Sequence, residues 1–228
     1  LRRGADRRGA IPADQRVEYV SICSPNHLHD AHIRLALRVG AHAICEKPLV
    51  INPWNLDALQ EIERETCRSV KTVLQLRVHP QLIALRERLL AEPNRRHSVC
   101  LTYITARGPW YDVSWKGVEE RSGGIVINIG IHFFDLLFWL FGRLNRSEVH
   151  AHDLHMAGGC LELERADVQW FLSTDSRDLP FTPQPGTKTT FRSITVDGDE
   201  IEVHQPDILI IEGLNVLQVD SRANEFVS

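Results

Sequence analysis

Apolar and polar positions follow two alternating patterns along the first third of the chain. Residues 17–23 form a β-rich run, and residues 27–39 repeat apolar side chains at helical spacing up to Gly40, which suits a helix end. A second buried strand is expected at 41–45, a helix from Asn52-Pro53, and a third strand at 69–78. Strands that alternate with helices of this length predict βαβ units around a parallel sheet.

The pattern changes after Pro80. A helix at 81–91 precedes an alternating strand at 99–105, and five shorter strand candidates follow at 147–152, 160–164, 167–172, 190–196 and 200–204. Asp197-Gly198 is expected to form a hairpin turn between the last two. We therefore predict two consecutive domains of different fold class: an α/β domain over 1–79, and an α+β domain with an open antiparallel sheet over 80–204. Residues 205–228 form an atypical tail.

The apolar stretch 125–141 is short for a membrane span, and it contains Asn128, His132 and Asp135. At about 100° per residue, these three side chains fall within an arc of roughly 60°. We expect a buried core helix with a polar seam. One interpretation is a functional seam, and the alternative is a core histidine bonded to an aspartate.

Composition narrows the class of protein. The 228 residues are 43% hydrophobic and 25% charged, and 26 basic against 30 acidic residues give a net charge of −4. This balance argues against a nucleic-acid binder. The five cysteines are widely spaced and include no CxxC pair, which favours a reducing cytoplasm over a disulfide scaffold. No histidine cluster has a recognised metal-ligand spacing, so we predict no metal site.

Polar side chains follow the strands of the predicted parallel sheet, where ligands bind in such folds. They lie in Ser24-Pro25-Asn26 with nearby His29, in Glu46-Lys47, and around Arg77. Each segment alone could be an ordinary polar turn. Lys47 stands between a buried strand and Pro48, so its backbone is restricted and its ammonium group can be aimed. Partial burial would bring the pKa of a lysine towards the working range of a proton-transfer catalyst.

The segments SICSPNHLHDAHI, EKP, QLRVHP and GGIVINIGIHFFDLL together resemble the Gfo/Idh/MocA oxidoreductases. RGPWYDVSWKG and RSITVDGDEIE are similar to the UDP-N-acetylglucosaminuronate 3-dehydrogenases within that family, which serve bacterial surface-polysaccharide (O-antigen) synthesis. The resemblance implies a partial NAD(P)-binding Rossmann domain at 1–79 and a substrate and oligomerisation domain at 80–204. It implies NAD as cofactor, a nucleotide sugar as substrate, and a homo-oligomer formed through the antiparallel sheet.

The resemblance also assigns roles to residues. Lys47 and His132 would be catalytic, in a cleft between the two domains. The residues implied to border the cofactor are Ser24, Pro25, Asn26, His29, Glu46 and Lys47. The residues implied to contact the substrate are Arg77, Trp110, Tyr111, Lys116, Asn128 and Asp135. The aromatic loop around Trp110 could equally belong to a subunit interface.

Two features depart from the family pattern. The sequence contains no GxGxxG turn, which in Rossmann folds holds the cofactor pyrophosphate at a helix N-terminus. We therefore expect that an opening βαβ unit of about 70 residues precedes Leu1 in a longer reading frame. The tail from Asp207 resembles a segment of bacterial pantothenate kinase without its phosphate loop, and no kinase activity is expected. The alternatives to a UDP-sugar dehydrogenase are an inactive fragment and another sugar or inositol dehydrogenase.

Overall fold

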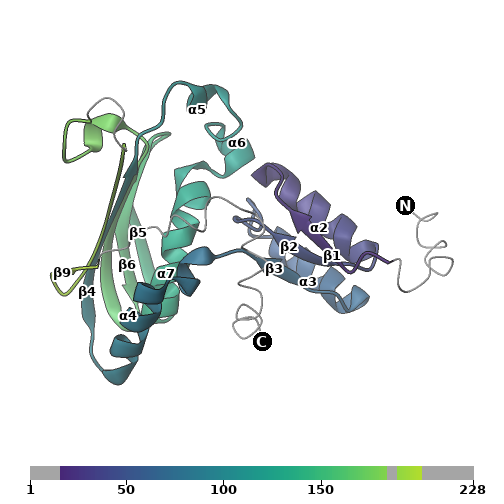
Figure 1. Cartoon of the computed structure of the whole chain (residues 1–228), viewed down its shortest axis with the longest axis horizontal. Coiled ribbons are helices and arrows are strands. Elements are labelled where there is room, and N and C mark those ends of the chain that lie inside the picture. The colour runs from purple at the N-terminus through teal and green to yellow at the C-terminus, as the bar shows by residue number, and fades with distance from the viewer. Residues whose placement is uncertain (1–15, 184–188, 202–228) are drawn as a thin grey trace. The chain divides into compact units, whose positions relative to one another are not determined.

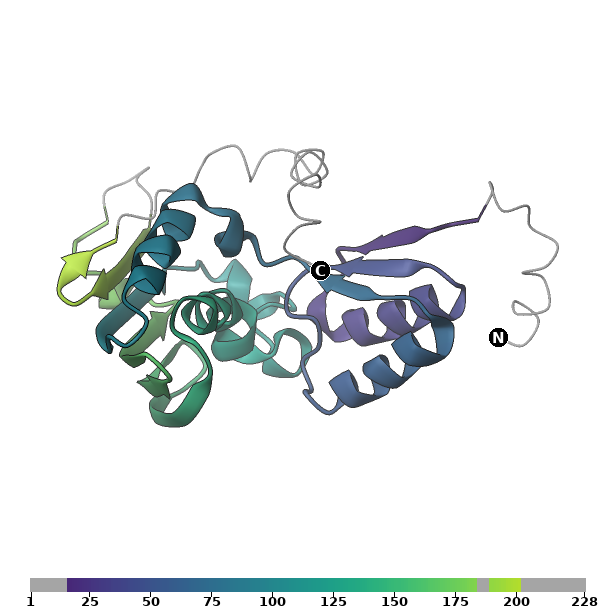
Figure 2. The same ribbon diagram turned by 90° about the horizontal axis from the view of Figure 1, so that it is seen from below.

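The computed structural model of this protein describes residues 16–183 and 189–201. These residues form two compact units, which Figures 1 and 2 show in ribbon form. The first unit runs to Leu74 and also includes Pro109–Ile131, and the second contains the remaining described residues. The change of pattern after Pro80 instead predicts that Pro109–Ile131 belongs to the second domain. The predicted tail at 205–228 lies outside the described residues.

The first unit is built on sheet A, whose three strands run in the order β1-β2-β3. Both neighbouring pairs are parallel. The strands are β1 (Tyr19–Ile22), β2 (His42–Cys45) and β3 (Val70–Thr72). The predicted parallel sheet is therefore present, with its carboxyl ends at Ile22, Cys45 and Thr72.

Two helices cover one face of sheet A, α2 (His29–Arg38) and α3 (Asn55–Thr66) (Figure 2). The buried core between helices and sheet consists of Ile22, Ile33, Ala36, Leu37, Ala43, Cys45, Leu59 and Ile62. A short 3₁₀ turn, η3 (Asn26–Leu28), leads directly into α2.

Gly40 ends α2 as the pattern predicts. Its φ of +88° is in the left-handed region, and its N–H donates to the carbonyl of Leu37 at 3.0 Å. The N–H of Ala41 donates to the carbonyl of Ala36, also at 3.0 Å. These two bonds form the glycine-dependent helix end in which the last carbonyls of the helix are satisfied before the chain enters β2.

The third strand is shorter than predicted. The strand expected at 69–78 is wrong beyond Thr72, because the chain leaves the sheet and forms a 3₁₀ turn, η4 (Gln75–Val78). The cause is a change of unit at Leu74, after which no strand of sheet A is available as a partner. The helix expected from Asn52 begins at Asn55, because the side chain of Asn52 caps the preceding turn by accepting from the N–H of Trp54.

The rest of the first unit is made of short helical segments, α5 (Trp110–Val113), α6 (Glu119–Ser122) and η5 (Val126–Gly130). The last of these is a π-helix rather than the α-helix that the sequence predicts. A π turn inserts one extra residue into the helical ladder. The spacing of 100° per residue therefore does not apply to the segment that carries Asn128, whereas His132 and Asp135 lie in α7 (Ile131–Phe141).

The second unit contains sheet B, with six strands in the order β5-β6-β7-β4-β8-β9. All neighbouring pairs are antiparallel except β4 and β7, which are parallel. The strands are β4 (His97–Thr105), β5 (Leu144–His152), β6 (Met156–Leu163), β7 (Ala166–Ser173), β8 (Thr190–Val196) and β9 (Asp199–Glu200). The predicted open sheet is present, with one parallel pair at its centre.

Two helices, α4 (Pro80–Ala91) and α7 (Ile131–Phe141), cover one face of sheet B (Figure 1). Aromatic pairs join α7 to the sheet: Phe133 packs on Tyr103 and Phe134 packs edge-on against Trp170, with ring centroids 4.8 and 5.1 Å apart. By length and composition, the stretch Glu119–Phe141 could cross a membrane, but half of its apolar window is buried in the structure. The sheet therefore takes up the apolar face of α7, as expected for a core helix.

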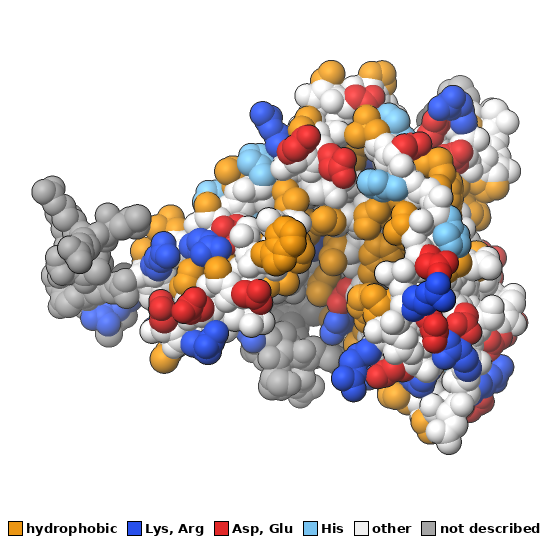
Figure 3. Space-filling model, turned by 180° about the vertical axis from the view of Figure 1, so that it is seen from behind, with side chains coloured by type: hydrophobic (Ala, Val, Ile, Leu, Met, Phe, Trp, Pro, Cys, Tyr) orange, Lys and Arg blue, Asp and Glu red, His pale blue; other side chains and the backbone are white. Residues whose placement is uncertain are grey.

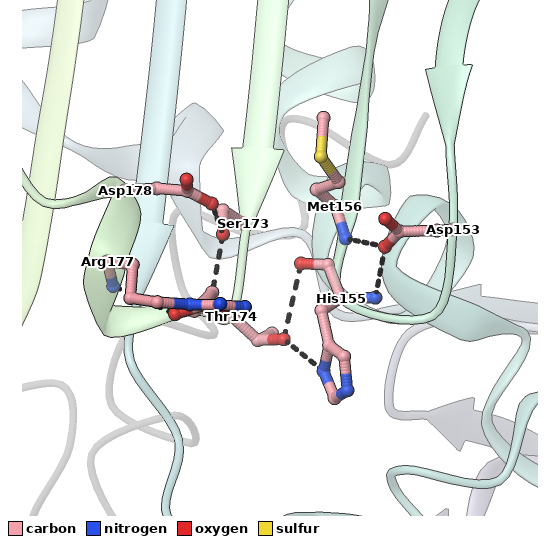
Figure 4. A network of polar contacts seen from close by, with 8 residues as sticks. Asp153, His155, Met156, Ser173, Thr174, Arg177 and Asp178 are labelled. Atoms are coloured by element: carbon pink, nitrogen blue, oxygen red, sulfur yellow. Dashed lines mark hydrogen bonds and ion pairs between the residues drawn. The ribbon is translucent and has the colours of Figure 1, made fainter.

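A polar network closes one end of sheet B (Figure 4). Asp153 accepts from the N–H groups of His155 and Met156 at 2.7 and 2.8 Å, and these bonds lower the pKa of its carboxyl group. Nδ1 of His155 lies 3.2 Å from Oγ1 of Thr174, and Ser173 donates to Asp178 at 2.6 Å. The network fixes the β5–β6 turn against the segment that follows β7, which gives His155 a structural role.

The hairpin turn predicted at Asp197-Gly198 is present. Both residues have left-handed φ values, +55° and +91°, as a two-residue hairpin turn requires. The following strand ends at Glu200, Ile201 is outside it, and residues 202–204 of the predicted strand lie beyond the described residues.

Candidate functional site

Lys47 lies at the carboxyl end of β2, in the first unit. Its peptide bond to Pro48 is cis, and its Nζ donates to the carbonyl oxygen of Asn128 at 2.5 Å. The side chain is half-buried. The ammonium group is therefore held at one point above the edge of sheet A, where parallel sheets bind ligands.

Asn26 also contacts the π segment, η5. It is only 5% exposed, and its amide nitrogen donates to the carbonyl of Ser122 at 2.8 Å and to Oδ1 of Asn128 at 3.1 Å. Both protons of the amide are thus used in interactions within the first unit. The side chain predicted to border a cofactor here connects the segment after β1 to the segment that carries Asn128. Its contact with a cofactor stays a prediction.

His29 and Ser24 join the ends of β1 and β2. The imidazole of His29 is fully buried, with Nδ1 2.7 Å from the carbonyl oxygen of Pro48 and Nε2 2.8 Å from that of Ser24. The hydroxyl of Ser24 lies 2.9 Å from Nδ1 of His32. The structure therefore shows His29 as a link between two loops, and its predicted contact with a cofactor stays a prediction.

The other two residues of these loops, Pro25 and Glu46, are half-buried. The N–H of Glu46 donates to the carbonyl of Ile22 at 2.9 Å, which extends the β1–β2 pairing to the edge of the site. Beside it, burial of the Cys45 thiol, with smaller effects of Glu46 and Cys23, raises its pKa to about 12. Cys45 is therefore a neutral core residue rather than a nucleophile.

The second unit holds three of the predicted site residues, Arg77, His132 and Asp135. Arg77, in η4, forms two hydrogen bonds with Asp135 of α7, one of them from Nε to Oδ2 at 2.8 Å. His132 is half-buried near the start of the same helix. The structure thus brings Arg77 and Asp135 together, and their predicted substrate contacts would be made by an ion pair rather than by two separate groups.

The aromatic loop in the first unit is only partly accessible. Trp110 is 51% exposed and meets Tyr111 edge-on, whereas Tyr111 itself is 5% exposed. The exposed Lys116 lies over the ring of Trp115, with 5.7 Å from Nζ to the ring centroid. A Cβ atom at Gly117 would come within 2.5 Å of the Tyr111 carbonyl, so this loop requires glycine there. Trp110 and Lys116 are accessible to a ligand, and Tyr111 contributes mainly packing.

Sequence reasoning missed Arg192 of β8. Its guanidinium carbon lies 5.2 Å from the ring centroid of Tyr103 and 5.8 Å from that of Phe133, the residue after His132. Its buried Nε has no hydrogen-bond partner among the described residues. A cation held on two aromatic rings is suited to receive an anion. The sequence signal was its place at the start of the segment RSITVDGDEIE, which carries part of the family resemblance.

Comparison with known proteins identifies the family. Residues 6–73 match the family profile described as "Oxidoreductase family, NAD-binding Rossmann fold", and residues 97–158 match the corresponding "C-terminal alpha/beta domain". Both profiles describe the Gfo/Idh/MocA oxidoreductases. The chain belongs to this family of oxidoreductases, which confirms the predicted family and fold class.

Solved structures show the same relationship over almost the whole chain. The chain is similar to the WlbA (WbpB) dehydrogenase from Thermus thermophilus in complex with NAD and UDP-GlcNAcA, at 48% identity and a TM-score of 0.84. A structure of that dehydrogenase with NAD and alpha-ketoglutarate gives 49% identity and a TM-score of 0.82. The matches cover 96% of this chain and 70% and 69% of those chains, respectively.

Curated relatives match over a shorter region. D-glucoside 3-dehydrogenase of Escherichia coli K12 is 32% identical over 151 residues, which are 62% of this chain and 40% of that protein. Inositol 2-dehydrogenase of Rhizobium meliloti is 30% identical over 136 residues, 39% of its length. The chain thus spans about 40% of the length of these relatives.

Proposed function

We propose that this chain is part of a dehydrogenase that oxidises the ring 3-hydroxyl of a UDP-sugar acid, UDP-N-acetylglucosaminuronate, with NAD as the oxidant. The observation that carries the proposal is the placement of Lys47, whose ammonium group is held by the Asn128 carbonyl at the carboxyl ends of the sheet A strands. The Thermus relative with 48% identity, solved with NAD and UDP-GlcNAcA, supports the choice of cofactor and substrate.

The residues around Lys47 fit one end of a dinucleotide. Ser24, Asn26 and Glu46 lie in the segments that follow β1 and β2, and a nicotinamide ribose is recognised by polar groups at such strand ends. The turn that binds pyrophosphate, GxGxxG, is not among the 228 residues. We therefore assign the nicotinamide and ribose end of the cofactor to this chain.

Oxidation of a secondary alcohol requires that the hydroxyl proton be removed while hydride leaves the same carbon. When bound, NAD supplies the hydride acceptor. In this proposal His132 takes up the hydroxyl proton, and the ammonium group of Lys47 stabilises negative charge that develops during the reaction. Asn128, through its amide, and the Arg77–Asp135 pair would orient the sugar.

The acidic substrate matches the cationic groups of the chain. Lys116 and Arg192 present cations beside aromatic rings, an arrangement suited to the carboxylate and diphosphate of a UDP-sugar acid. We assign the enzyme to the synthesis of surface polysaccharide, in the cytoplasm, where its five free thiols would remain reduced.

The outer face of sheet B is proposed as the surface of a homo-oligomer. Strand β5 is exposed along almost its whole length, including Val149 at 60%. On the face of the molecule in Figure 3, acidic and basic side chains are intermixed. Mixed charges suit contact with a second copy of the chain, where each sign can meet its opposite, better than contact with nucleic acid.

A second candidate rests on the lack of GxGxxG in the 228 residues: this polypeptide by itself is inactive, because it does not retain the dinucleotide. A third is a dehydrogenase for another sugar or inositol, which the relatives from Escherichia coli and Rhizobium meliloti favour.

One experiment separates the three. The chain is titrated with NAD by calorimetry, and NADH formation is then followed with UDP-N-acetylglucosaminuronate, with UDP-N-acetylglucosamine, which lacks the sugar carboxylate, with a simple glucoside and with myo-inositol. Saturable NAD binding with turnover of the acid alone supports the proposal. Turnover of the glucoside or inositol overturns the assigned substrate. Failure to bind NAD supports the inactive polypeptide.

A further inference from the structure

His29 has an unusual set of hydrogen-bond partners. Its side chain is fully buried at the first position of α2, and both ring nitrogens lie within 2.8 Å of an oxygen atom. Nδ1 faces the carbonyl of Pro48 and Nε2 faces the carbonyl of Ser24. Each partner is a backbone carbonyl, which accepts hydrogen bonds and cannot donate them.

A neutral imidazole carries one N–H and one lone pair, so it can satisfy only one of these carbonyls. With a neutral ring, the other carbonyl oxygen would face a nitrogen lone pair at close range. Both bonds form together only when both nitrogens carry protons. We infer that His29 is a buried imidazolium that ties the segment after β1 to the segment after β2, and that it acts as a positioning residue for Lys47.

Two effects oppose a charge at this position. Burial disfavours the charged form, and the positive end of α2 repels a cation. Against them stand two short charge-assisted hydrogen bonds, which are stronger than bonds between neutral groups. The carbonyl dipoles of Ser24 and Pro48 point their negative ends at the ring. They therefore stabilise the positive charge of the doubly protonated imidazole from two sides.

The neighbouring titratable groups have partners of their own. On α2, Asp30 forms an ion pair with Arg34 at 2.8 Å, and His32 bonds the Ser24 hydroxyl at 2.9 Å. On the loop after β2, Lys47 donates to Asn128, and Glu46 is half-buried beside it. The described residues show no carboxylate hydrogen-bonded to His29, so the two carbonyls carry the stabilisation of its charge.

The link matters because Pro48 follows Lys47 directly. With the Pro48 carbonyl bonded to His29, the backbone of Lys47 is fixed with respect to α2 and to Ser24. Loss of one proton from His29 would release one of the two loops. The role of His29 as a positioning residue thus rests on the proposed function of Lys47. The inferred protonation state of His29 does not depend on that function.

His42 of β2 provides an internal comparison in the same unit. The backbone N–H of Ser69 donates to its Nδ1 at 3.0 Å, and a guanidinium nitrogen of Arg68 lies 3.2 Å from its Nε2. The guanidinium can only donate, so Nε2 of His42 offers a lone pair, while the Ser69 hydroxyl, 2.8 Å from Nδ1, can accept a ring proton there. His42 therefore has a partner that requires a lone pair, whereas both partners of His29 require a ring proton.

The test is a two-bond ¹H–¹⁵N correlation spectrum of the imidazoles in the wild-type chain, recorded at neutral pH. His29→Gln and His42→Gln variants, or through-bond correlation from the assigned backbone, identify the two signals. We expect two protonated nitrogens for His29 and one for His42. A bare ring nitrogen on His29 under these conditions overturns the inference, whether or not the chain is an active dehydrogenase.

The positioning role has its own readout. In an active preparation, His29→Gln should lower kcat about tenfold or more, while the KM for the sugar changes little, because Lys47 is misplaced rather than removed. His42→Gln should leave both values near those of the wild type. If the spectrum shows an imidazolium but kcat is unchanged in His29→Gln, His29 is not a positioning residue. If no dehydrogenase activity exists at all, the proposed function fails while the spectrum still decides the charge.

Discussion

Arg77 and Asp135 form a two-point ion pair that joins η4 to α7 within the second unit. The carboxylate is more deeply buried than the guanidinium, with 12% and 39% of the side chains exposed. Such a fork of parallel hydrogen bonds fixes orientation as well as distance. The pair therefore sets the position of α7 near His132, and substitutions in it should affect stability and turnover together.

Arg77→Lys keeps the charge but loses the planar fork. We expect a loss of about 1–2 kcal/mol in the free energy of unfolding, measured by urea denaturation. We also expect a lower kcat in NADH formation. Arg143→Lys is the matched control, because Arg143 pairs with Glu164 while 91% of its side chain is exposed. An Arg77→Lys chain as stable and active as the control would contradict this role.

Lys47→Ala should lower kcat by about 10²–10⁴-fold, because the ammonium group that stabilises developing negative charge is lost. The comparison is Lys71→Gln, at the middle position of β3 and outside the proposed machinery. Steady-state NADH formation measures both. Turnover of the Lys47→Ala chain within a few-fold of the Lys71→Gln chain would remove Lys47 from the proposed mechanism.

Asn26→Asp should destabilise the first unit more than Asn26→Ala. The alanine variant leaves the Ser122 carbonyl without its donor, at a cost of about 1–3 kcal/mol. The aspartate variant instead places a negative charge against two acceptor oxygens, those of Ser122 and Asn128. Urea denaturation of the two variants gives the order. Equal stability of the aspartate and alanine variants would show that the amide is not a donor to these oxygens.

Cys45 should resist alkylation in the folded chain. Burial, then the charge of Glu46, raises the pKa of its thiol to about 12, so at pH 8 a fraction of about 10⁻⁴ is thiolate. The exposed Cys23, Cys67 and Cys100 should react readily with iodoacetamide. Peptide mapping by mass spectrometry after a short exposure checks the order of reaction.

The raised pKa of Cys45 also affects stability. In the unfolded chain the thiol has a pKa near 9.0, so below that pH the residue favours the folded state. This contribution is lost as the pH rises towards 12.

Asp197→Asn should lower Tm at neutral pH by ~2–4 °C. The Ser98 N–H, then His97, lowers the pKa of the Asp197 carboxyl below 3.8. A lowered folded-state pKa means that this contribution is present above pH 3.8 and is lost as pH falls through the folded value. Thermal unfolding of the variant and the wild type across the acid range should therefore converge at low pH. A constant difference in Tm at all pH values would assign the effect to the turn backbone.

Local patterns in the sequence determined the elements. The helical spacing up to Gly40, the β-rich run before Ser24 and the Asp197-Gly198 turn depend on residues close in sequence, and the structure places a helix end, a strand and a hairpin there. The same segments carried the family resemblance, which the comparisons confirm. Lys47 and His132 could also be singled out from the sequence. Lys47 directly follows a predicted strand, and His132 is a polar residue in an apolar helix.

Only the tertiary structure determined which residues form hydrogen bonds and ion pairs with one another. Nothing local shows that Asn26 reaches Ser122, that Arg77 binds Asp135, or that both nitrogens of His29 face carbonyls. Such contacts join residues up to about a hundred positions apart, and their formation depends on how whole elements pack. The π turn at Val126–Gly130 and the early end of β3 have the same origin, because available hydrogen-bond partners, rather than local preference, set where those elements change.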